Sequence, residues 1–367
     1  MKECLIMLKL NHVNPHLTLD KWKPIGEEGK NSEVWIARDK QLEQVLVLKV
    51  ITKSSLEKQN VEDFFLESKI LNEAKHPHIM PINYAAEDDQ NIYITMPYYE
   101  KGSINSLIDK EMLSAREIIK YSIDFLSGLM FLHIKELVHL DIKPTNVMLN
   151  DSNRAILTDF GLSRYLNENG LANQEFQYRI HRSPESFDTS DKTVTDDIYQ
   201  AGLTMYRMCN GNENFKEQFT NLTSKYGHDR DKIVKAIKKG ECPHRRYYLP
   251  HIPKKLSRII NKMLHPDVSK RYQEVLSIIN DLSNVEELLD WKYEEVKSNE
   301  EVQWTYNNER SIINIKIEKR SSNKFLTLGN KYIKTSDNTQ RLRKVEKSHS
   351  SFEEAMGFIE RILPEYS

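Results

Sequence analysis

The spacing of apolar residues changes character at Gly102 in this chain of 367 residues. Before Gly102, short β-branched and aromatic runs alternate with turn signals, which predicts a small sheet whose first strands, within 22–51, are antiparallel. After Gly102 the apolar residues recur at helical spacing, most clearly over 114–134. Strands first and helices afterwards predict an α+β fold, with a small sheet lobe on a larger helical lobe and a cleft between them. Further segments are predicted as a helix over 61–74, a strand ending at 93–96, and helices over 197–209 and 256–264.

Charge and cysteine content argue against several classes of protein. There are 53 Lys or Arg and 54 Asp or Glu, so no global field favours nucleic acid or a membrane. Cys4, Cys209 and Cys242 are an odd, widely spaced set, which argues for a reducing compartment and against a disulfide framework. The opening apolar run is too short for a signal peptide, and no run reaches the roughly 18 apolar residues of a membrane helix. We therefore expect a soluble cytoplasmic protein with no membrane partner, or one delivered into a host cell by a route that needs no signal peptide.

Two carboxylates and one carboxamide follow the long predicted helix at fixed spacing. Asp141 and Asn146 lie within the segment that runs from His139 to Asn146, and Asp159 opens an Asp-Phe-Gly tripeptide after a short apolar run. Carboxylate and amide oxygens are the hard ligands that Mg²⁺ prefers, and a carboxylate can also accept a proton. The pattern predicts a site for phosphoryl transfer.

The order of these residues resembles the catalytic and magnesium loops of eukaryotic-type (Hanks-type) Ser/Thr protein kinases. The resemblance covers residues 20–285 and implies a bilobal kinase fold, with a β-rich lobe at 20–96 and a helical lobe at 100–285. It further implies ATP as the phosphoryl donor, Mg²⁺ as the metal with Mn²⁺ as a substitute, and Ser/Thr hydroxyls of protein substrates as acceptors. Autophosphorylation is also expected, because serines and threonines are abundant on predicted loops. The Lys-, Asn- and Ile-rich composition is typical of a bacterial or viral member.

The resemblance assigns catalytic roles to four residues. Asp141 would accept the proton of the substrate hydroxyl and orient that oxygen for in-line attack. Asn146 and Asp159 would hold the magnesium ions. Lys143 would steady the γ-phosphate, and a lysine at this place favours a Ser/Thr acceptor over a tyrosine.

The nucleotide would be held by residues of the sheet lobe. Lys49 ends a predicted strand, where kinases place the lysine that holds the α- and β-phosphates and pairs with a helix glutamate, here Glu67. The loop around Gly29 offers close backbone N–H donors, but it departs from the family's glycine pattern. Met96 would be the gatekeeper before a hinge that includes Tyr98. The expected nucleotide-binding residues are Ile25, Gly26, Gly29, Ser32, Val34, Lys49, Glu67, Met96, Pro97 and Tyr99.

Two residues depart from the family pattern near the catalytic aspartate. Leu140 stands where many kinases have an arginine that receives an activation-loop phosphate, so we expect activity not to depend on such a phosphate. Tyr178 stands where Ser/Thr kinases commonly have a threonine, which leaves the peptide preference open. Three other residues are expected to be structural: Glu185 should pair with Arg271, and Asp197 should brace the backbone of the catalytic loop.

The ends of the chain have no counterpart in the resemblance. Residues 1–19 form an N-terminal extension, 286–300 are predicted as an acidic linker helix, and 301–367 as a small α/β accessory domain. Its final helix should begin with a capping box of Ser351 and Glu354. Residues 310–347 carry eleven Lys or Arg against three Asp or Glu. This stretch could bind an acidic or nucleic-acid partner, or it could simply be a solvated sheet face.

Two alternatives to an active protein kinase stay open. A pseudokinase-type binding module would explain the irregular glycine loop. A small-molecule phosphotransferase of kinase-like fold would share the Asp141 and Asn146 spacing. It would usually lack the Ser-Pro-Glu sequence ending at Glu185 and the helical region before Arg271, both of which are present.

Overall fold

The computed structural model describes residues 18–26, 32–53, 75–174, 179–297 and 301–366. These residues belong to two compact units. The first takes its described residues from Met1–Lys69 and Pro81–Tyr98, and the second from Ile70–Met80 and Tyr99–Ser367. The predicted helix over 61–74 and Tyr178 lie outside the described residues.

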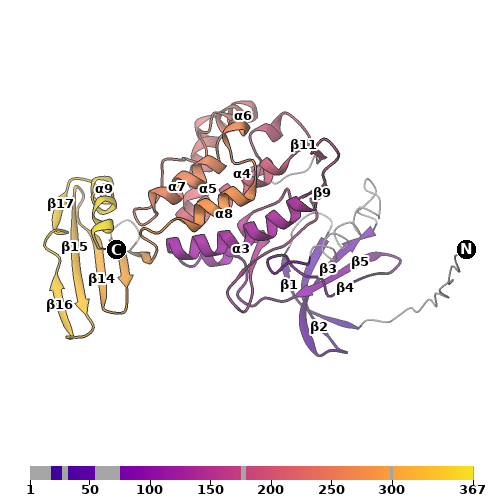
Figure 1. Cartoon of the computed structure of the whole chain (residues 1–367), viewed down its shortest axis with the longest axis horizontal. Coiled ribbons are helices and arrows are strands. Elements are labelled where there is room, and N and C mark those ends of the chain that lie inside the picture. Colours follow the sequence, from indigo (N-terminus) through magenta and orange to yellow (C-terminus); the bar gives the residue numbers. More distant parts are fainter. Residues whose placement is uncertain (1–17, 27–31, 54–74, 175–178, 298–300, 367) are drawn as a thin grey trace, which may run out of the picture. The chain divides into compact units, whose positions relative to one another are not determined.

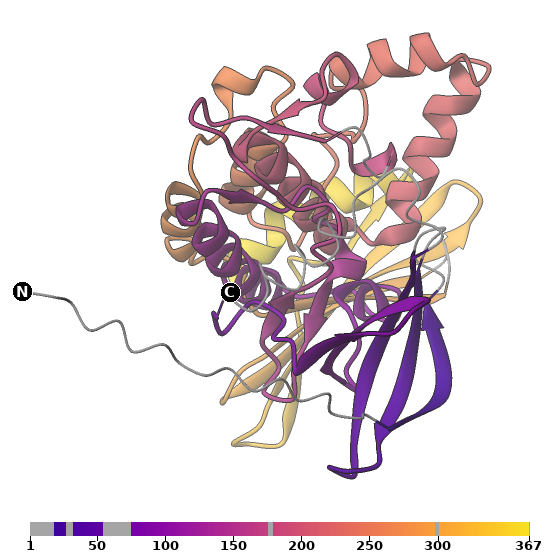
Figure 2. The ribbon, with the colours of Figure 1, turned by 90° about the vertical axis from the view of Figure 1, so that its right-hand side faces the viewer.

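The first unit is a five-stranded antiparallel sheet in the order β1-β2-β3-β5-β4 (Figures 1 and 2). Its core follows from the alternation in β3, where Leu46, Leu48 and Val50 point to one face and pack with Ala37 of β2. The strands predicted within 22–51 and at 93–96 are therefore confirmed. The bounds are β1 Leu19–Gly26, β2 Ser32–Asp39, β3 Gln44–Thr52, β4 Tyr84–Glu87 and β5 Asn91–Pro97.

Helices are the main elements of the second unit up to residue 283 (Figure 1). The longest, α3, begins where Ser114 and Glu117 form a capping box, and its apolar stripe is buried, as its periodicity predicts. No helix among the described residues is both long and apolar enough to cross a bilayer. The helices are α2 Ile104–Ile108, α3 Ala115–Ile134, α4 Val194–Asn210, α5 Asn212–Lys225, α6 Arg230–Lys238, α7 Lys254–Met263 and α8 Val275–Ser283. The short strands are β6 Leu137–Val138, β7 Val147–Leu149, β8 Ala155–Leu157, β9 Arg164–Tyr165, β10 Ala172–Asn173 and β11 Asp191–Lys192.

The C-terminal part is a six-stranded antiparallel sheet with helix α9 packed against β14, β15 and β17 (Figure 1). Trp291 and Trp304 are fully buried in its core. A small accessory domain of one sheet and one helix is therefore present, as predicted. Its elements are β12 Trp291–Lys297, β13 Glu301–Asn307, β14 Ser311–Ser321, β15 Lys324–Ile333, β16 Asn338–Arg341, β17 Lys347–His349 and α9 Phe352–Ile362.

Two details of the C-terminal prediction are wrong. The linker helix expected over 286–300 is contradicted by β12, in which Trp291 and Tyr293 are buried while Lys292 is exposed. The capping box of α9 is only half formed. Ser351 accepts from the main-chain nitrogen of Glu354 at 3.1 Å, but the Glu354 carboxylate accepts from Ser350 instead.

Four of the eleven Lys or Arg residues within 310–347 form ion pairs inside the accessory domain. Lys316 contacts Glu301 and Glu318, and Arg320 also contacts Glu318. Arg341 pairs with Glu346, and Lys344 with Glu365. These pairs favour the solvated sheet face over a basic binding surface, because paired lysines and arginines project less net charge to a partner.

The accessory domain is attached to the start of α3. Arg116 makes two hydrogen bonds to the Asp290 carboxylate, at 2.5 and 2.8 Å, and its main-chain nitrogen donates to the Leu289 carbonyl at 2.9 Å. His251 stacks on Tyr293 with 5.8 Å between ring centroids. The attachment therefore combines polar contacts on α3 with aromatic packing on β12.

Candidate active site

The register of the first sheet gathers the described nucleotide-site candidates on one face. Lys49 lies opposite Val34 on β2 and Ile94 on β5, and Val47, two residues earlier, lies opposite Met96. Directly paired residues and their i±2 neighbours point to the same face of a sheet, so Val34, Lys49 and Met96 share one face.

The remaining nucleotide-site candidates lie at the ends of strands, in the second unit or outside the described residues. Gly26 ends β1 and Ser32 begins β2, on either side of a loop that is not described, while Ile25 is exposed at a register shift. Pro97 ends β5, and Tyr99 belongs to the second unit. Gly29 and Glu67 lie outside the described residues.

Asp141 is the central acid of the second unit. One oxygen of its carboxylate, Oδ2, accepts from Lys143 Nζ and from Asn146 Nδ2, both at 2.9 Å. Burial raises the pKa of the Asp141 carboxyl to about 6, with Lys143 lowering it and the charge of Asp159 raising it. The structure thus brings together Asp141, Lys143 and Asn146, which the sequence had singled out.

Asn146 is held so that its amide oxygen is the atom left for a ligand. Its nitrogen donates to both the main-chain oxygen and the carboxylate of Asp141, each at 2.9 Å. Its oxygen accepts only a weak 3.2 Å contact from the Thr145 hydroxyl among the described residues. The main-chain nitrogen of Thr158, next to Asp159, donates to the main-chain oxygen of Asn146 at 2.9 Å. An amide oxygen and a carboxylate are hard ligands that suit Mg²⁺, so the chemistry of Asn146 and Asp159 fits the metal expected from the sequence.

His139 fastens the Asp159 loop to the catalytic loop. Its ring nitrogen Nε2 lies 3.1 Å from the Thr158 carbonyl, and its ring packs on Phe160 with centroids 4.9 Å apart. Burial lowers the pKa of His139, so the neutral ring donates from Nε2, and Nδ1 accepts from the Asp141 main-chain nitrogen at 3.3 Å. Asp159 itself has a left-handed backbone, with φ of 62°, which is rare for residues other than glycine.

Helix α4 supports the catalytic loop through one face. Asp197 accepts from the main-chain nitrogens of His139 at 2.8 Å and Leu140 at 2.7 Å, as predicted. One turn later, Gln200 bonds the main chain on both sides of Asp141, and Thr204 follows on the same face. Gln200 was not predicted, because its partners are main-chain groups that carry no signal in the sequence.

Leu140 fills an apolar pocket where the resemblance had suggested an arginine. It is fully buried and packs with Val138 and Ala172, together with the partly buried Leu162 and Val194. Its backbone is left-handed, with φ of 66°. The side chain therefore joins the catalytic loop to the following segment by apolar contact rather than by charge.

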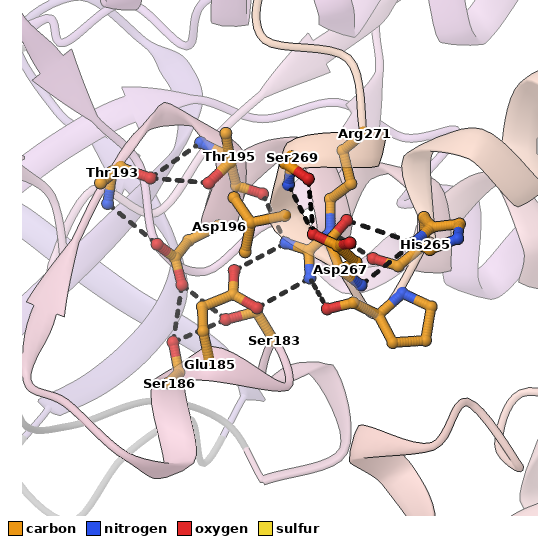
Figure 3. Close-up of polar contacts among 12 residues, drawn as sticks. Ser183, Glu185, Ser186, Thr193, Thr195, Asp196, His265, Asp267, Ser269 and Arg271 are labelled. Atoms are coloured by element: carbon orange, nitrogen blue, oxygen red, sulfur yellow. Dashed lines mark hydrogen bonds and ion pairs between the residues drawn. The ribbon is translucent and has the colours of Figure 1, made fainter.

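The segment that follows Asp159, here called the activation segment, ends in the Ser-Pro-Glu sequence at Glu185. This end is anchored by buried polar contacts (Figure 3). Arg271 donates to both oxygens of Glu185, at 2.6 and 2.7 Å, which confirms the predicted pair. Asp196 accepts from the hydroxyls of Ser183 at 2.5 Å and Ser186 at 2.6 Å. Both acids hold the residues around Pro184 against the helical core.

Comparison with known proteins agrees with this arrangement. A family model described as protein kinase domain matches residues 19–285, which is more than half of the chain. The probable serine/threonine-protein kinase PknB of Lactococcus lactis is 26% identical over 271 residues, covering 72% of this chain and 42% of the relative. The serine/threonine-protein kinase PknD of Protochlamydia amoebophila is 24% identical over 297 residues, covering 71% of this chain and 29% of the relative. The chain thus spans less than half the length of these curated relatives.

Proposed function

Because the chain belongs to the protein kinase family, we propose that it transfers the γ-phosphoryl group of ATP to serine or threonine hydroxyls of proteins. One observation carries the proposal: the Asp141 carboxylate is bonded at 2.9 Å to both Lys143 and Asn146 within a loop braced by α4. Both relatives described above carry serine/threonine-protein kinase in their names, which supports the acceptor class. Autophosphorylation is part of the proposal.

Asp141 is proposed to accept the proton of the acceptor hydroxyl. Lys143 and Asn146 both hold Oδ2, and no hydrogen bond to Oδ1 is found among the described residues. Oδ1 is therefore the atom that can face the hydroxyl group. A pKa raised to about 6 suits this role, because the group is ionised at neutral pH yet more basic than an ordinary aspartate.

Asn146 and Asp159 are proposed to hold the metal ion that accompanies ATP. Mg²⁺ bound there would neutralise charge on the phosphate oxygens. Asn146 presents its amide oxygen because its nitrogen is held by Asp141, while His139 fixes the loop that carries Asp159. Lys143 supplies a positive charge beside Asp141 for the transferring group.

Lys49 is proposed to hold the nucleotide phosphates with Glu67 as its partner. Its place on the sheet face shared with Val34 and Met96 supports this, because that face joins a cationic group to apolar side chains that suit a base.

A turnover assay tests the proposal. Wild-type protein, Asp141→Asn and the exposed control Asp231→Asn are incubated with Mg-ATP and dephosphorylated casein, and phosphate incorporation is measured. We expect Asp141→Asn to lose about 100-fold or more, since a general base contributes about 10²–10⁴-fold, and the control to match wild type. Nucleotide binding without turnover by the wild type would instead identify a binding module. Phosphorylation of a small alcohol but not of protein would identify the small-molecule alternative.

A further inference from the structure

Gln200 holds the main chain on both sides of the catalytic aspartate. The side chain lies in the middle of α4 and is 1% exposed. Its Nε2 donates to the Leu140 carbonyl at 2.9 Å, and its Oε1 accepts from the Ile142 main-chain nitrogen at 2.9 Å. We propose that Gln200 is a positioning residue that sets the direction of the Asp141 carboxylate. The inference rests on the phosphoryl transfer proposed above.

The two groups that Gln200 contacts demand opposite chemistry. The Leu140 carbonyl needs a donor, and the Ile142 N–H needs an acceptor. A planar carboxamide carries both on neighbouring atoms, whereas a carboxylate carries only acceptors and a hydroxyl offers a single atom. Gln200 therefore closes a ring of hydrogen bonds around one residue, Asp141, which no substituent of similar size would reproduce.

The other described side chains from α4 and its surroundings bond the main chain of this loop on one side of Asp141 only. Within this loop, Asp197 accepts from the main-chain nitrogens of His139 and Leu140, which precede Asp141. After Asp141, His181 and Thr204 reach the Ile142 carbonyl, at 3.1 and 3.4 Å, rather than its nitrogen. Among the described residues, Gln200 is the side chain that bonds main-chain groups both before and after Asp141.

The backbone at this point needs to be held. Leu140 has a left-handed φ of 66°, a conformation that a leucine keeps only where its surroundings fix it. Asp197 fixes the nitrogen of Leu140 and Gln200 fixes its carbonyl, so both peptide planes of the residue are determined by α4. Losing Gln200 would let the plane between Leu140 and Asp141 rotate and would move the carboxylate away from its attacking geometry.

Three variants test the inference. Gln200→Met keeps length and volume but removes both hydrogen bonds, and Gln200→Glu keeps the acceptor but removes the donor. Gln218→Met is the matched control, because Gln218 also accepts from a main-chain nitrogen, that of His244 at 2.7 Å, and also donates to side chains. None of the described contacts of Gln218 involves the catalytic loop.

The readouts are kcat and KM for ATP with casein as acceptor, thermal melting, and amide hydrogen exchange of residues 140–142. We expect both Gln200 variants to lose about tenfold or more in kcat, with KM for ATP changed less than about twofold, since misplacement affects the chemical step more than binding. Exchange at Ile142 should accelerate in Gln200→Met, which removes the acceptor of that N–H, and should change less in Gln200→Glu, which keeps it. Gln218→Met should keep the wild-type kcat even if its melting temperature falls as far as those of the Gln200 variants.

Each outcome bears on one claim. Wild-type kcat in Gln200→Met would overturn the positioning role while leaving the kinase proposal intact. An inactive wild type would overturn the kinase proposal and, with it, any catalytic role for Gln200. Unchanged exchange at Ile142 in Gln200→Met would show that the amide does not hold the loop, whatever the turnover.

Discussion

Arg271 donates two parallel hydrogen bonds to the Glu185 carboxylate, and its own side chain is completely buried. Its remaining donor capacity goes to main-chain oxygens, including that of His265 at 2.6 Å. We expect Arg271→Ala to destabilise the protein by about 3 kcal/mol or more, because a buried charged network loses its central donor. Chemical denaturation measures the change. Lys292→Ala, which removes an exposed pair with Glu117, is the control and should cost less than about 1 kcal/mol.

Activity should not require a phosphate on the segment that follows Asp159. Leu140 is buried among apolar side chains, so the residue with which many kinases bind that phosphate carries no charge here. Protein stripped by a phosphatase should phosphorylate casein at the same initial rate as untreated protein. Loss of turnover on dephosphorylation of residues 163–182 would contradict the prediction.

Restoring an arginine at this position should damage the fold. We expect Leu140→Arg to destabilise the protein by several kcal/mol, because a guanidinium would replace a side chain that has no exposed surface. Leu140→Met, of similar volume and apolarity, should cost less than about 1.5 kcal/mol. Thermal melting curves compare the stability of the two variants. Equal stability would show that the pocket tolerates a charge.

His251 should make stability depend on pH. Burial lowers the pKa of His251 to about 4, and its Nε2 already donates to the Leu113 carbonyl. The folded state therefore binds fewer protons than the unfolded state between pH 4 and the usual value near 6.5. The contribution of His251 is complete above that range and is lost as the pH falls, by roughly 3 kcal/mol in all.

Denaturation of wild type and His251→Phe at pH 7.5, 6 and 5 measures this effect. The phenylalanine keeps a ring against Tyr293 but cannot bind a proton. We expect the variant to lose less stability on acidification than the wild type. Equal slopes for the two proteins would assign the acid sensitivity to other groups, such as His181, whose pKa burial lowers as well.

The stability of the accessory domain should depend on its core packing more than on the surface salt bridge that joins it to α3. Arg116 and Asp290 have side chains that are 58% and 40% exposed, so Arg116→Ala should cost less than about 1 kcal/mol. Trp291 is fully buried against Tyr306, and Trp291→Ala should cost about 3–5 kcal/mol. Comparable losses for the two variants in denaturant titrations would mean that the ion pair matters more than its exposure allows.

Local patterns were enough to predict the parts of the fold that depend on neighbours in sequence. The β-rich runs within 22–51 predicted antiparallel strands, and the helical spacing of apolar residues over 114–134 predicted α3. Segment 291–297 was wrongly predicted as a helix because its strand character depends on pairing with β13. Pairing with a partner strand is a tertiary effect that outweighs local propensity.

The candidate site was likewise predicted only in part from the sequence. Asp141, Asn146 and Asp159 stand out in the sequence because their side chains carry the chemistry. Gln200 does not, since its partners are main-chain groups 58 and 60 residues away, and a main-chain group looks the same whatever the residue. The filling of the pocket around Leu140 was also hidden, because it draws on Ala172 and Val194 from separate segments.

The bond from Arg116 N–H to the Leu289 carbonyl has a practical consequence for anyone who trims this protein. The first N–H groups of a helix have no partner within it, and here one of them is satisfied by a residue beyond position 285. A recombinant fragment cut where the family match stops would leave the Arg116 N–H without this partner and would remove Tyr293, which stacks on His251. A boundary chosen from homology alone would therefore separate the start of α3 from residues that complete its hydrogen bonding.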